Sequence, residues 1–222
     1  MSVVKKQMVS GYWDPITSSI DWCEKNYQHS FYIAEMFNAF SSLSMVIVGL
    51  LIITRLRLRL FGALITIVGI GSFLFHSTLY SRFQALDEVP MIWSAIYIIN
   101  STISKPKKGK TTFLIASGIV ASIFISCTTG NIQFVLFHAF NLLFQTIAFV
   151  KLYQKVQFQR RSLRILKVAT FFYSLGLVCW ILDLHFCESF QSSNLHSWWH
   201  LFSSIGTYYF AKIILNRVRF YQ

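Results

Sequence analysis

Seven long apolar blocks constrain the fold of this chain more than any other feature of its sequence. A membrane-spanning helix needs about 20 mostly apolar residues. The chain is 55% hydrophobic and 13% charged, whereas soluble domains carry about 25% charged residues. We therefore predict an all-α fold, an integral membrane bundle of seven transmembrane helices that forms one domain over residues 1–222. The expected helices cover, approximately, residues 34–54, 61–80, 87–104, 111–128, 132–152, 167–185 and 197–215.

The charged residues alternate between the two sides of this predicted bundle. All eight acidic residues are expected on one side, and short basic connections stay in the cytosol. We therefore expect a lumenal N-terminal segment (1–33) and a cytosolic tail (216–222). The net charge of +12 is then a signal of topology, and nucleic acid is not an expected partner. Sixteen of the 20 basic residues follow the first, third, fifth and seventh blocks: Arg55, Arg57, Arg59, Lys105, Lys107, Lys108, Lys110, Lys151, Lys155, Arg160, Arg161, Arg164, Lys167, Lys212, Arg217 and Arg219.

Three histidines are expected at the outer, lumenal end of the bundle. His76 lies in "GSFLFHSTL" near the end of the second block, and "LHSWWH" places His196 and His200 four residues apart, on one helix face. Three imidazoles from two helices can hold zinc and leave a fourth position for water, as in catalytic zinc sites. The alternative is a pair of interfacial histidines beside an aromatic belt formed by Trp198 and Trp199.

Ser72 and Asp87 each allow two interpretations. Ser72 lies one turn before His76 and could donate to a developing oxyanion. A serine in a membrane helix often bonds the carbonyl four residues back, however, and the residues alone favour that role. Asp87 lies three residues before Pro90, near the expected start of the third helix, where it could be an N-cap. It could equally act as a general base and then a general acid near a zinc site.

The N-terminal segment contains an acidic stretch, "DWCEKN". Asp21, Glu24 and Asn26, with Glu35 further on, offer the oxygen ligands that calcium prefers. Their spacing is not that of an EF-hand, so composition alone favours a solvated acidic segment.

Cys23 and Cys187 are both expected on the lumenal side, where a disulfide can form. A bond between them would attach the N-terminal segment to the connection before the last helix. Two free thiols are the alternative.

Four motifs in this chain resemble those of the alkaline ceramidases. They are "GYWDPITSSIDWCEKNY", "AEMFNAFSSLSM", "GIGSFLFHSTLYSRFQALDEVPMIW" and "HSWWHLFSSIGTY", and together they cover nearly the whole chain. The alkaline ceramidases are seven-helix membrane amidases in a superfamily that also includes the adiponectin receptors. The resemblance implies a hydrolase of the endoplasmic reticulum or Golgi membrane that cleaves the amide bond of ceramide to sphingosine and a fatty acid.

The resemblance also implies roles for individual residues and reverses two of the interpretations above. The resemblance implies that Ser72 is catalytic rather than a serine that donates to the carbonyl four residues back. It also implies that the acidic segment is a calcium site rather than a solvated stretch. Cys23 and Cys187 match positions where family members can form a disulfide. The implied ligands and catalytic groups are His76, His196 and His200 for zinc, Ser72 and Asp87 for catalysis, and Asp21, Trp22 (through its backbone carbonyl), Glu24, Asn26 and Glu35 for calcium.

Other functions remain open at this point. A seven-helix receptor of the same superfamily would use zinc structurally, although structural zinc is usually closed by four protein ligands. A related hydrolase could act on another lipid, although an anionic headgroup is disfavoured because no basic pocket is expected on the lumenal side. A transporter ranks low, because the sequence shows neither repeats nor broken helices. Ceramide from the bilayer is the expected partner, and no protein partner is indicated.

Overall fold

The computed structural model describes residues 10–103 and 108–218, and this part of the chain is mostly helical, with an irregular segment over residues 10–35 and no strand. Seven long helices of 20 to 27 residues make up the bundle. A one-turn helix, α7, and a 3-10 turn, η1, lie between the last two of them. The bounds are α1 Met36–Arg55, α2 Arg59–Thr78, α3 Ser81–Thr102, α4 Lys108–Cys127, α5 Gly130–Val156, α6 Arg160–His185, α7 Cys187–Phe190, η1 Gln191–Ser193 and α8 Leu195–Val218.

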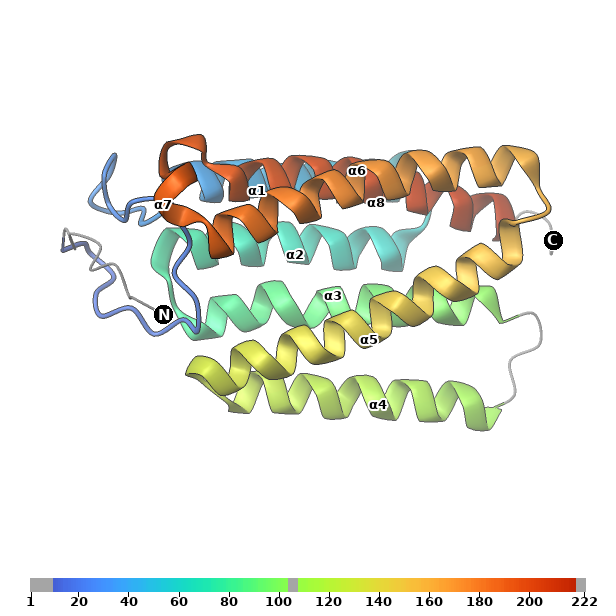
Figure 1. Ribbon diagram of the computed structural model, residues 1–222. Coiled ribbons are helices and arrows are strands. Elements are labelled where there is room, and N and C mark those ends of the chain that lie inside the picture. Colours follow the sequence, from blue (N-terminus) through green and yellow to red (C-terminus); the bar gives the residue numbers. More distant parts are fainter. Residues whose placement is uncertain (1–9, 104–107, 219–222) are drawn as a thin grey trace.

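The long helices run up and down beside one another (Figure 1). One end of the bundle carries the N-terminal segment and the α2–α3, α4–α5 and α6–α8 connections; we call it the outer end. The opposite, inner end carries the α1–α2 and α5–α6 connections, the end of α3, the start of α4 and the end of α8. The basic connections therefore gather at the inner end, as the charge pattern predicts. Lys105, Lys107 and Arg219 of that pattern lie outside the described residues, as do residues 1–9 of the expected N-terminal segment and 219–222 of the expected tail.

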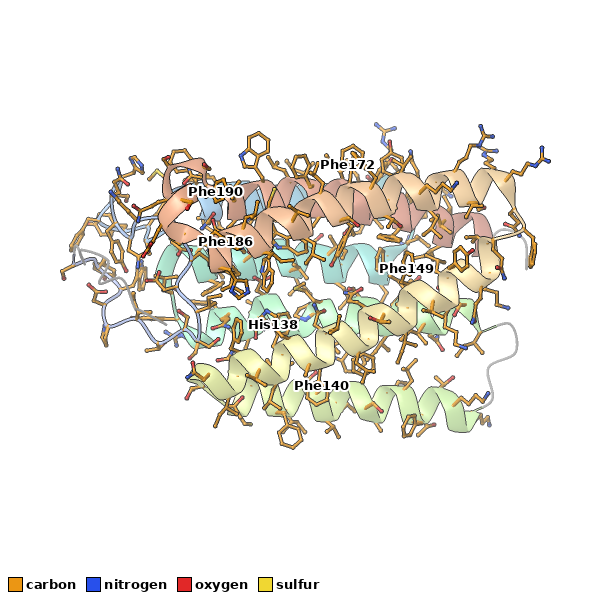
Figure 2. All side chains as sticks on the ribbon, in the orientation of Figure 1. His138, Phe140, Phe149, Phe172, Phe186 and Phe190 are labelled. Carbon is orange, nitrogen blue, oxygen red and sulfur yellow. A yellow bond between two sulfur atoms is a disulfide. The ribbon has the colours of Figure 1, made fainter. Side chains whose placement is uncertain are left out.

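Five helices, α1, α2, α4, α5 and α6, are long and apolar enough to cross a membrane. The helices α3 and α8 are as long but are not among these five, and they carry many of the polar residues described below. Large apolar side chains are exposed on the outside of the bundle, among them Phe113, Leu142 and Phe171, and Figure 2 shows Phe149 on this surface. An apolar exterior is expected where lipid replaces water, so the predicted all-α membrane bundle is confirmed.

The start of the third helix differs from the prediction. It begins at Ser81 rather than near residue 87, so Pro90 lies inside α3 and not in its first turn. Asp87 is therefore not an N-cap, and that interpretation is wrong. The prediction relied on hydropathy, which marks where a helix enters the apolar region. The backbone hydrogen bonds of α3 begin one and a half turns earlier, in the more polar "SRFQAL".

The basic ends of two other helices are also longer than expected. The fifth helix ends at Val156 rather than 152, and the sixth begins at Arg160 rather than 167. Lysine and arginine are good helix formers, so helical structure continues beyond the apolar part of each segment. The eighth helix likewise extends to Val218, which places the first residues of the expected 216–222 tail in a helix.

Glycines allow close packing between neighbouring helices at two levels of the bundle. A Cβ added at Gly49 of α1 would lie 2.8 Å from the carbonyl oxygen of Gly62 in α2. A Cβ added at Gly71 of α2 would lie 2.6 Å from the backbone nitrogen of Asp87 in α3. Small residues at such contacts let helix backbones approach each other in membrane proteins. The second contact brings the segment around Ser72 against the segment around Asp87.

The N-terminal segment packs over the outer end of the bundle. The backbone nitrogens of Thr17 and Ser18 donate to the carbonyl of Leu79 at 3.1 and 2.9 Å, just after α2. Ser19 N donates to Gln84 Oε1 of α3 at 2.7 Å. These hydrogen bonds fix the part of the N-terminal segment that directly precedes the acidic stretch, and they attach it to the end of α2 and the start of α3.

Candidate active site

The structure brings His76 of α2 together with His196 and His200 of α8 at the outer end of the bundle. One ring nitrogen from each lies within 4.8 Å of the others. All three side chains are buried, with at most 4% of their surface exposed. Three neutral imidazoles this close form a donor set suited to zinc, and they leave further coordination positions open.

Hydrogen bonds fix two of the three rings. Glu35 Oε2 lies 2.6 Å from His76 Nδ1, so Nδ1–H donates to the carboxylate and Nε2 keeps its lone pair. His200 Nδ1 lies 2.8 Å from Ser41 Oγ, and the Ser41 hydroxyl itself donates to Asn38 O at 3.0 Å. Ser41 therefore accepts the proton of His200 Nδ1, which leaves a lone pair on His200 Nε2. Such partners on the second ring nitrogen are usual for metal-binding histidines.

The third histidine, His196, gives a further indication that these residues fit a metal. Its Nδ1 is buried and has no hydrogen-bond partner among the described residues. A buried polar atom without a partner costs about 1–3 kcal/mol. Direct metal coordination or a change of tautomer around a bound ion would remove that cost. The donor set and this atom are both consistent with a metal at the three histidines.

Ser72 and Asp87 meet beside this cluster. Ser72 is buried, and its hydroxyl donates to the carboxylate of Asp87, which is half-buried. Ser72 Oγ also lies 3.5 Å from His200 Nε2. Ser77 and Thr78 on the same helix instead donate to carbonyls four residues back. Ser72 thus contacts the polar centre rather than its own helix.

Glu24 belongs to the N-terminal segment, and its side chain contacts the start of α1. Its two carboxylate oxygens accept hydrogen bonds from Phe37 N at 2.8 Å and Asn38 N at 2.9 Å. Burial raises the pKa of Glu24 to about 7, although these two backbone hydrogen bonds oppose the shift. A carboxylate this buried is stabilised by any cation bound nearby.

Hydrogen bonds join the other expected calcium ligands in two pairs. Asn26 Nδ2 donates to Asp21 Oδ1 at 3.0 Å, and Trp22 N donates to Glu35 Oε1 at 3.0 Å. The structure therefore brings oxygen-bearing side chains from the acidic stretch and from the start of α1 together, and such hard oxygens suit calcium. Because Glu35 also bonds His76, this cluster and the histidine cluster share a residue.

A disulfide joins Cys23 to Cys187 in the short helix α7, with 5.3 Å between their Cα atoms. Beside it, the buried Asp183 of α6 accepts two backbone hydrogen bonds. Its Oδ2 accepts from Cys23 N at 3.0 Å and its Oδ1 from His196 N at 3.2 Å. The alternative of two free thiols is excluded in this structure.

Several polar residues of the site were missed by the sequence interpretation. Ser41 supports His200, and Ser197 of α8 donates to Asn38 Oδ1 at 2.9 Å. The polar spacing within "NAFSSLSM" was the available signal for these contacts. Gln84 donates to Glu88 Oε1 at 2.6 Å, which forms a second buried polar group in α3.

His138 of α5 does not join the three histidines. It lies on the outer half of α5 (Figure 2), with its ring 5.3 Å from that of Trp180. Its Nδ1 is 2.7 Å from Phe134 O, four residues back on the same helix. It is therefore a useful comparison for the histidines in the cluster.

A buried polar centre of this kind inside a helical membrane bundle indicates function, because ionisable groups are costly there. The family model described as Ceramidase matches residues 14–220. Alkaline ceramidase 3 of Mus musculus is 30% identical over an aligned length of 223 residues, and the alignment covers 89% of this chain and 83% of that protein. An alkaline ceramidase of Arabidopsis thaliana is 32% identical over an aligned length of 216 residues, and the alignment covers 90% of this chain and 84% of the relative. The chain belongs to the ceramidase family, a family of hydrolases, and the resemblance read from its motifs is confirmed.

Proposed function

We propose that this protein is a zinc-dependent, calcium-regulated membrane amidase that hydrolyses ceramide to sphingosine and a free fatty acid. The observation that carries the proposal is the contact between Ser72 and Asp87 next to the three buried histidines. A structural metal site needs neither a serine hydroxyl nor a carboxylate in this place, so the pair favours a hydrolase over a receptor. Membership of the ceramidase family supports the same choice.

The metal would be held by His76, His196 and His200. Zinc in that position supplies Lewis acidity, which polarises a carbonyl group and makes water more acidic. Glu35 and Ser41 orient two of these imidazoles through their Nδ1 atoms.

Asp87 and Ser72 would divide the remaining chemistry of amide cleavage. The Asp87 carboxylate takes a proton from water as the water oxygen bonds to the acyl carbon. Asp87 then delivers that proton to the amide nitrogen as the carbon–nitrogen bond breaks, which releases the amine. The Ser72 hydroxyl can turn from Asp87 to donate to the carbonyl oxygen, where negative charge develops.

Ceramide suits this environment because it has two long apolar tails and a small uncharged head. The tails would lie in the apolar part of the bundle, with the amide at the depth of Ser72. Among the described residues of the outer end, the basic side chains are Lys25 and Arg82, and Arg82 packs over the rings of Tyr80 and Phe83. We therefore favour ceramide over a phospholipid, whose phosphate would need a basic partner.

Calcium would act as a structural regulator that holds the N-terminal segment against the start of α1. Asp21, the Trp22 carbonyl, Glu24, Asn26 and Glu35 are its proposed ligands. The contact between Glu35 and His76 supports this role, because it joins the proposed calcium site to the proposed zinc site.

We also propose that the outer end faces the lumen of the endoplasmic reticulum or Golgi and that the C-terminus is cytosolic. The gathering of basic residues at the inner end supports this orientation. The active site would then open at the lumenal side.

The test is product formation by purified protein given a panel of ceramides and phospholipids. We expect sphingosine release from ceramide by the wild-type protein and none by His196→Ala. Phospholipid cleavage without ceramide cleavage would point to the related hydrolase of another lipid. No product from any lipid, by folded protein that binds zinc, would favour the receptor.

A further inference from the structure

The three clustered histidines are not supported in the same way. His76 Nδ1 contacts a carboxylate and His200 Nδ1 contacts a hydroxyl, but neither ring nitrogen of His196 has a hydrogen-bond partner among the described residues, whichever of the two would bind the metal. Histidines that bind metal almost always use the second ring nitrogen to fix their orientation. Some other contact must therefore orient the imidazole of His196.

The indole of Trp22 provides that contact. Its ring stacks on the imidazole of His196 with 3.6 Å between centroids and 24° between planes. Trp180 of α6 packs edge-on against the same indole at 5.8 Å. Both Trp22 and His196 are buried. A face-to-face contact this close restricts rotation of the imidazole about its χ2 angle.

The backbones on either side of this stack are attached to a single carboxylate. Asp183 accepts a hydrogen bond from Cys23 N, next to Trp22, and another from His196 N. The disulfide between Cys23 and Cys187 then ties this part of the N-terminal segment to the connection that precedes α8. The stacked pair is thus fixed at its rings by packing and at its backbones by Asp183.

We propose that the Trp22 side chain is a positioning residue for His196, with Asp183 and the Cys23–Cys187 disulfide behind it. The stack takes the place of the ring hydrogen bond that His76 and His200 have. This inference rests on the metal site of the proposed function. It gives Trp22 a role separate from that of its backbone carbonyl in the proposed calcium site. Retention of the metal then depends on the N-terminal segment even when calcium is saturating.

The primary test compares Trp22→Leu with Trp13→Leu in the full-length purified protein. Leucine removes the stacked ring but keeps an apolar side chain and the backbone carbonyl. Trp13 belongs to the same segment, donates to Tyr32 O at 2.9 Å and packs edge-on against Tyr12 and Tyr80 rather than against a site histidine. Chelator competition at saturating calcium gives the zinc dissociation constant of each variant.

We expect Trp22→Leu to weaken zinc binding about 10-fold or more, since loss of an outer-shell partner typically costs about 10–100-fold. Trp22→Phe should recover part of the loss because a smaller ring can still stack, and Trp13→Leu should match the wild type. Equal dissociation constants for Trp22→Leu and wild type would overturn the proposal. So would an effect that appears only when calcium is removed.

A second measurement separates positioning from a general loss of stability. The rise in Tm on adding zinc is measured for each variant from its own zinc-free form. A side chain that only stabilises the fold lowers Tm equally with and without zinc, whereas a positioning residue also reduces the rise. If Trp22→Leu does not fold, Asp183→Asn and Trp22→Phe serve in its place. An unchanged zinc-dependent rise in both of these would overturn the proposal.

The failure of this inference can be distinguished from the failure of the proposed metal site. Wild-type protein that binds no zinc overturns the metal site and this proposal together. Wild-type protein that binds zinc, with unchanged affinity in Trp22→Leu, overturns the positioning role alone. The double variant of Trp22→Leu and Asp183→Asn should lose less affinity than the two single losses combined, because both act on one ligand. Full additivity would show that Trp22 and Asp183 act independently.

Discussion

The outer and inner ends of the bundle are built from the same helices, but the buried polar side chains of the site gather at the outer end. At the outer end, α1 and α2 bury Asn38, Ser42, Ser72 and His76. At the inner end they bury an apolar core that includes Ile52, Phe61 and Ile65. Buried polar groups are costly unless they are paired, so the outer end is kept for function and the inner end supplies packing. The predictions below test that division.

The largest effect is expected from His196→Ala, which removes one of the three clustered imidazoles. We expect loss of measurable ceramide hydrolysis together with loss of bound zinc, measured by product analysis and elemental analysis on the same sample. His138→Ala is the matched control, because it removes a histidine at the outer half of α5 that lies outside the cluster. Equal activity in the two variants would show that the cluster is not the active site.

Ser72→Ala should lower turnover by about 10²–10³-fold, the usual cost of one oxyanion donor. Zinc content should stay at the wild-type level, since the hydroxyl is not one of the clustered ligands. The measurement is kcat with ceramide, and Ser77→Ala is the control because the Ser77 hydroxyl donates to Phe73 O of its own helix. Wild-type turnover in Ser72→Ala would contradict the catalytic role and favour the alternative, in which Ser72 only donates to the carbonyl four residues back.

Ser41→Ala should weaken zinc binding by about 10-fold or more, since it removes the partner of His200 Nδ1. Chelator competition measures the dissociation constant. Thr54→Ala of the same helix is the control, since that hydroxyl bonds the backbone near the inner end. Unchanged affinity in Ser41→Ala would mean that the hydrogen bond does not orient the ligand.

Calcium removal should have a smaller effect than loss of any zinc ligand. We expect a chelator selective for calcium to reduce activity several-fold and to lower Tm, while zinc stays bound. The reason is that calcium would organise the N-terminal segment around Glu24 and Glu35 without entering the histidine cluster. If calcium addition changes neither activity nor Tm, the calcium assignment is wrong.

Substitutions in the apolar core of the inner end should lower stability without changing turnover. Ile52→Ala should lower the free energy of unfolding by about 2–5 kcal/mol, as other large-to-small core substitutions do. Turnover per folded molecule should change little, because Ile52 lies in the apolar core away from the polar centre. A large loss of kcat in the folded variant would contradict the division between the two ends.

The sequence predicted the helical membrane fold well because hydropathy and charge alternation are both visible along the chain. It placed the ends of helices less well, since Ser81 to Leu86 and Arg160 to Leu166 are helical without being uniformly apolar. Hydropathy reports where the lipid begins rather than where backbone hydrogen bonding begins. The error mattered at Asp87, where a wrong helix start suggested an N-cap.

The site was predicted only in part from the residues themselves. Helical spacing identified the face shared by His196 and His200, and depth suggested His76 as their neighbour. Spacing could not show that Asp183 contacts His196, because those residues lie on different helices and meet through backbone atoms. Nor could it show the Trp22 stack, which depends on how the N-terminal segment folds over the bundle.

The most direct test of this account is the metal content of purified, active protein. We predict about one zinc per chain, bound in wild type and lost in His76→Ala, His196→Ala and His200→Ala. Activity should disappear when zinc is removed and return when it is restored. Full ceramide hydrolysis by folded protein that contains no transition metal would contradict the account.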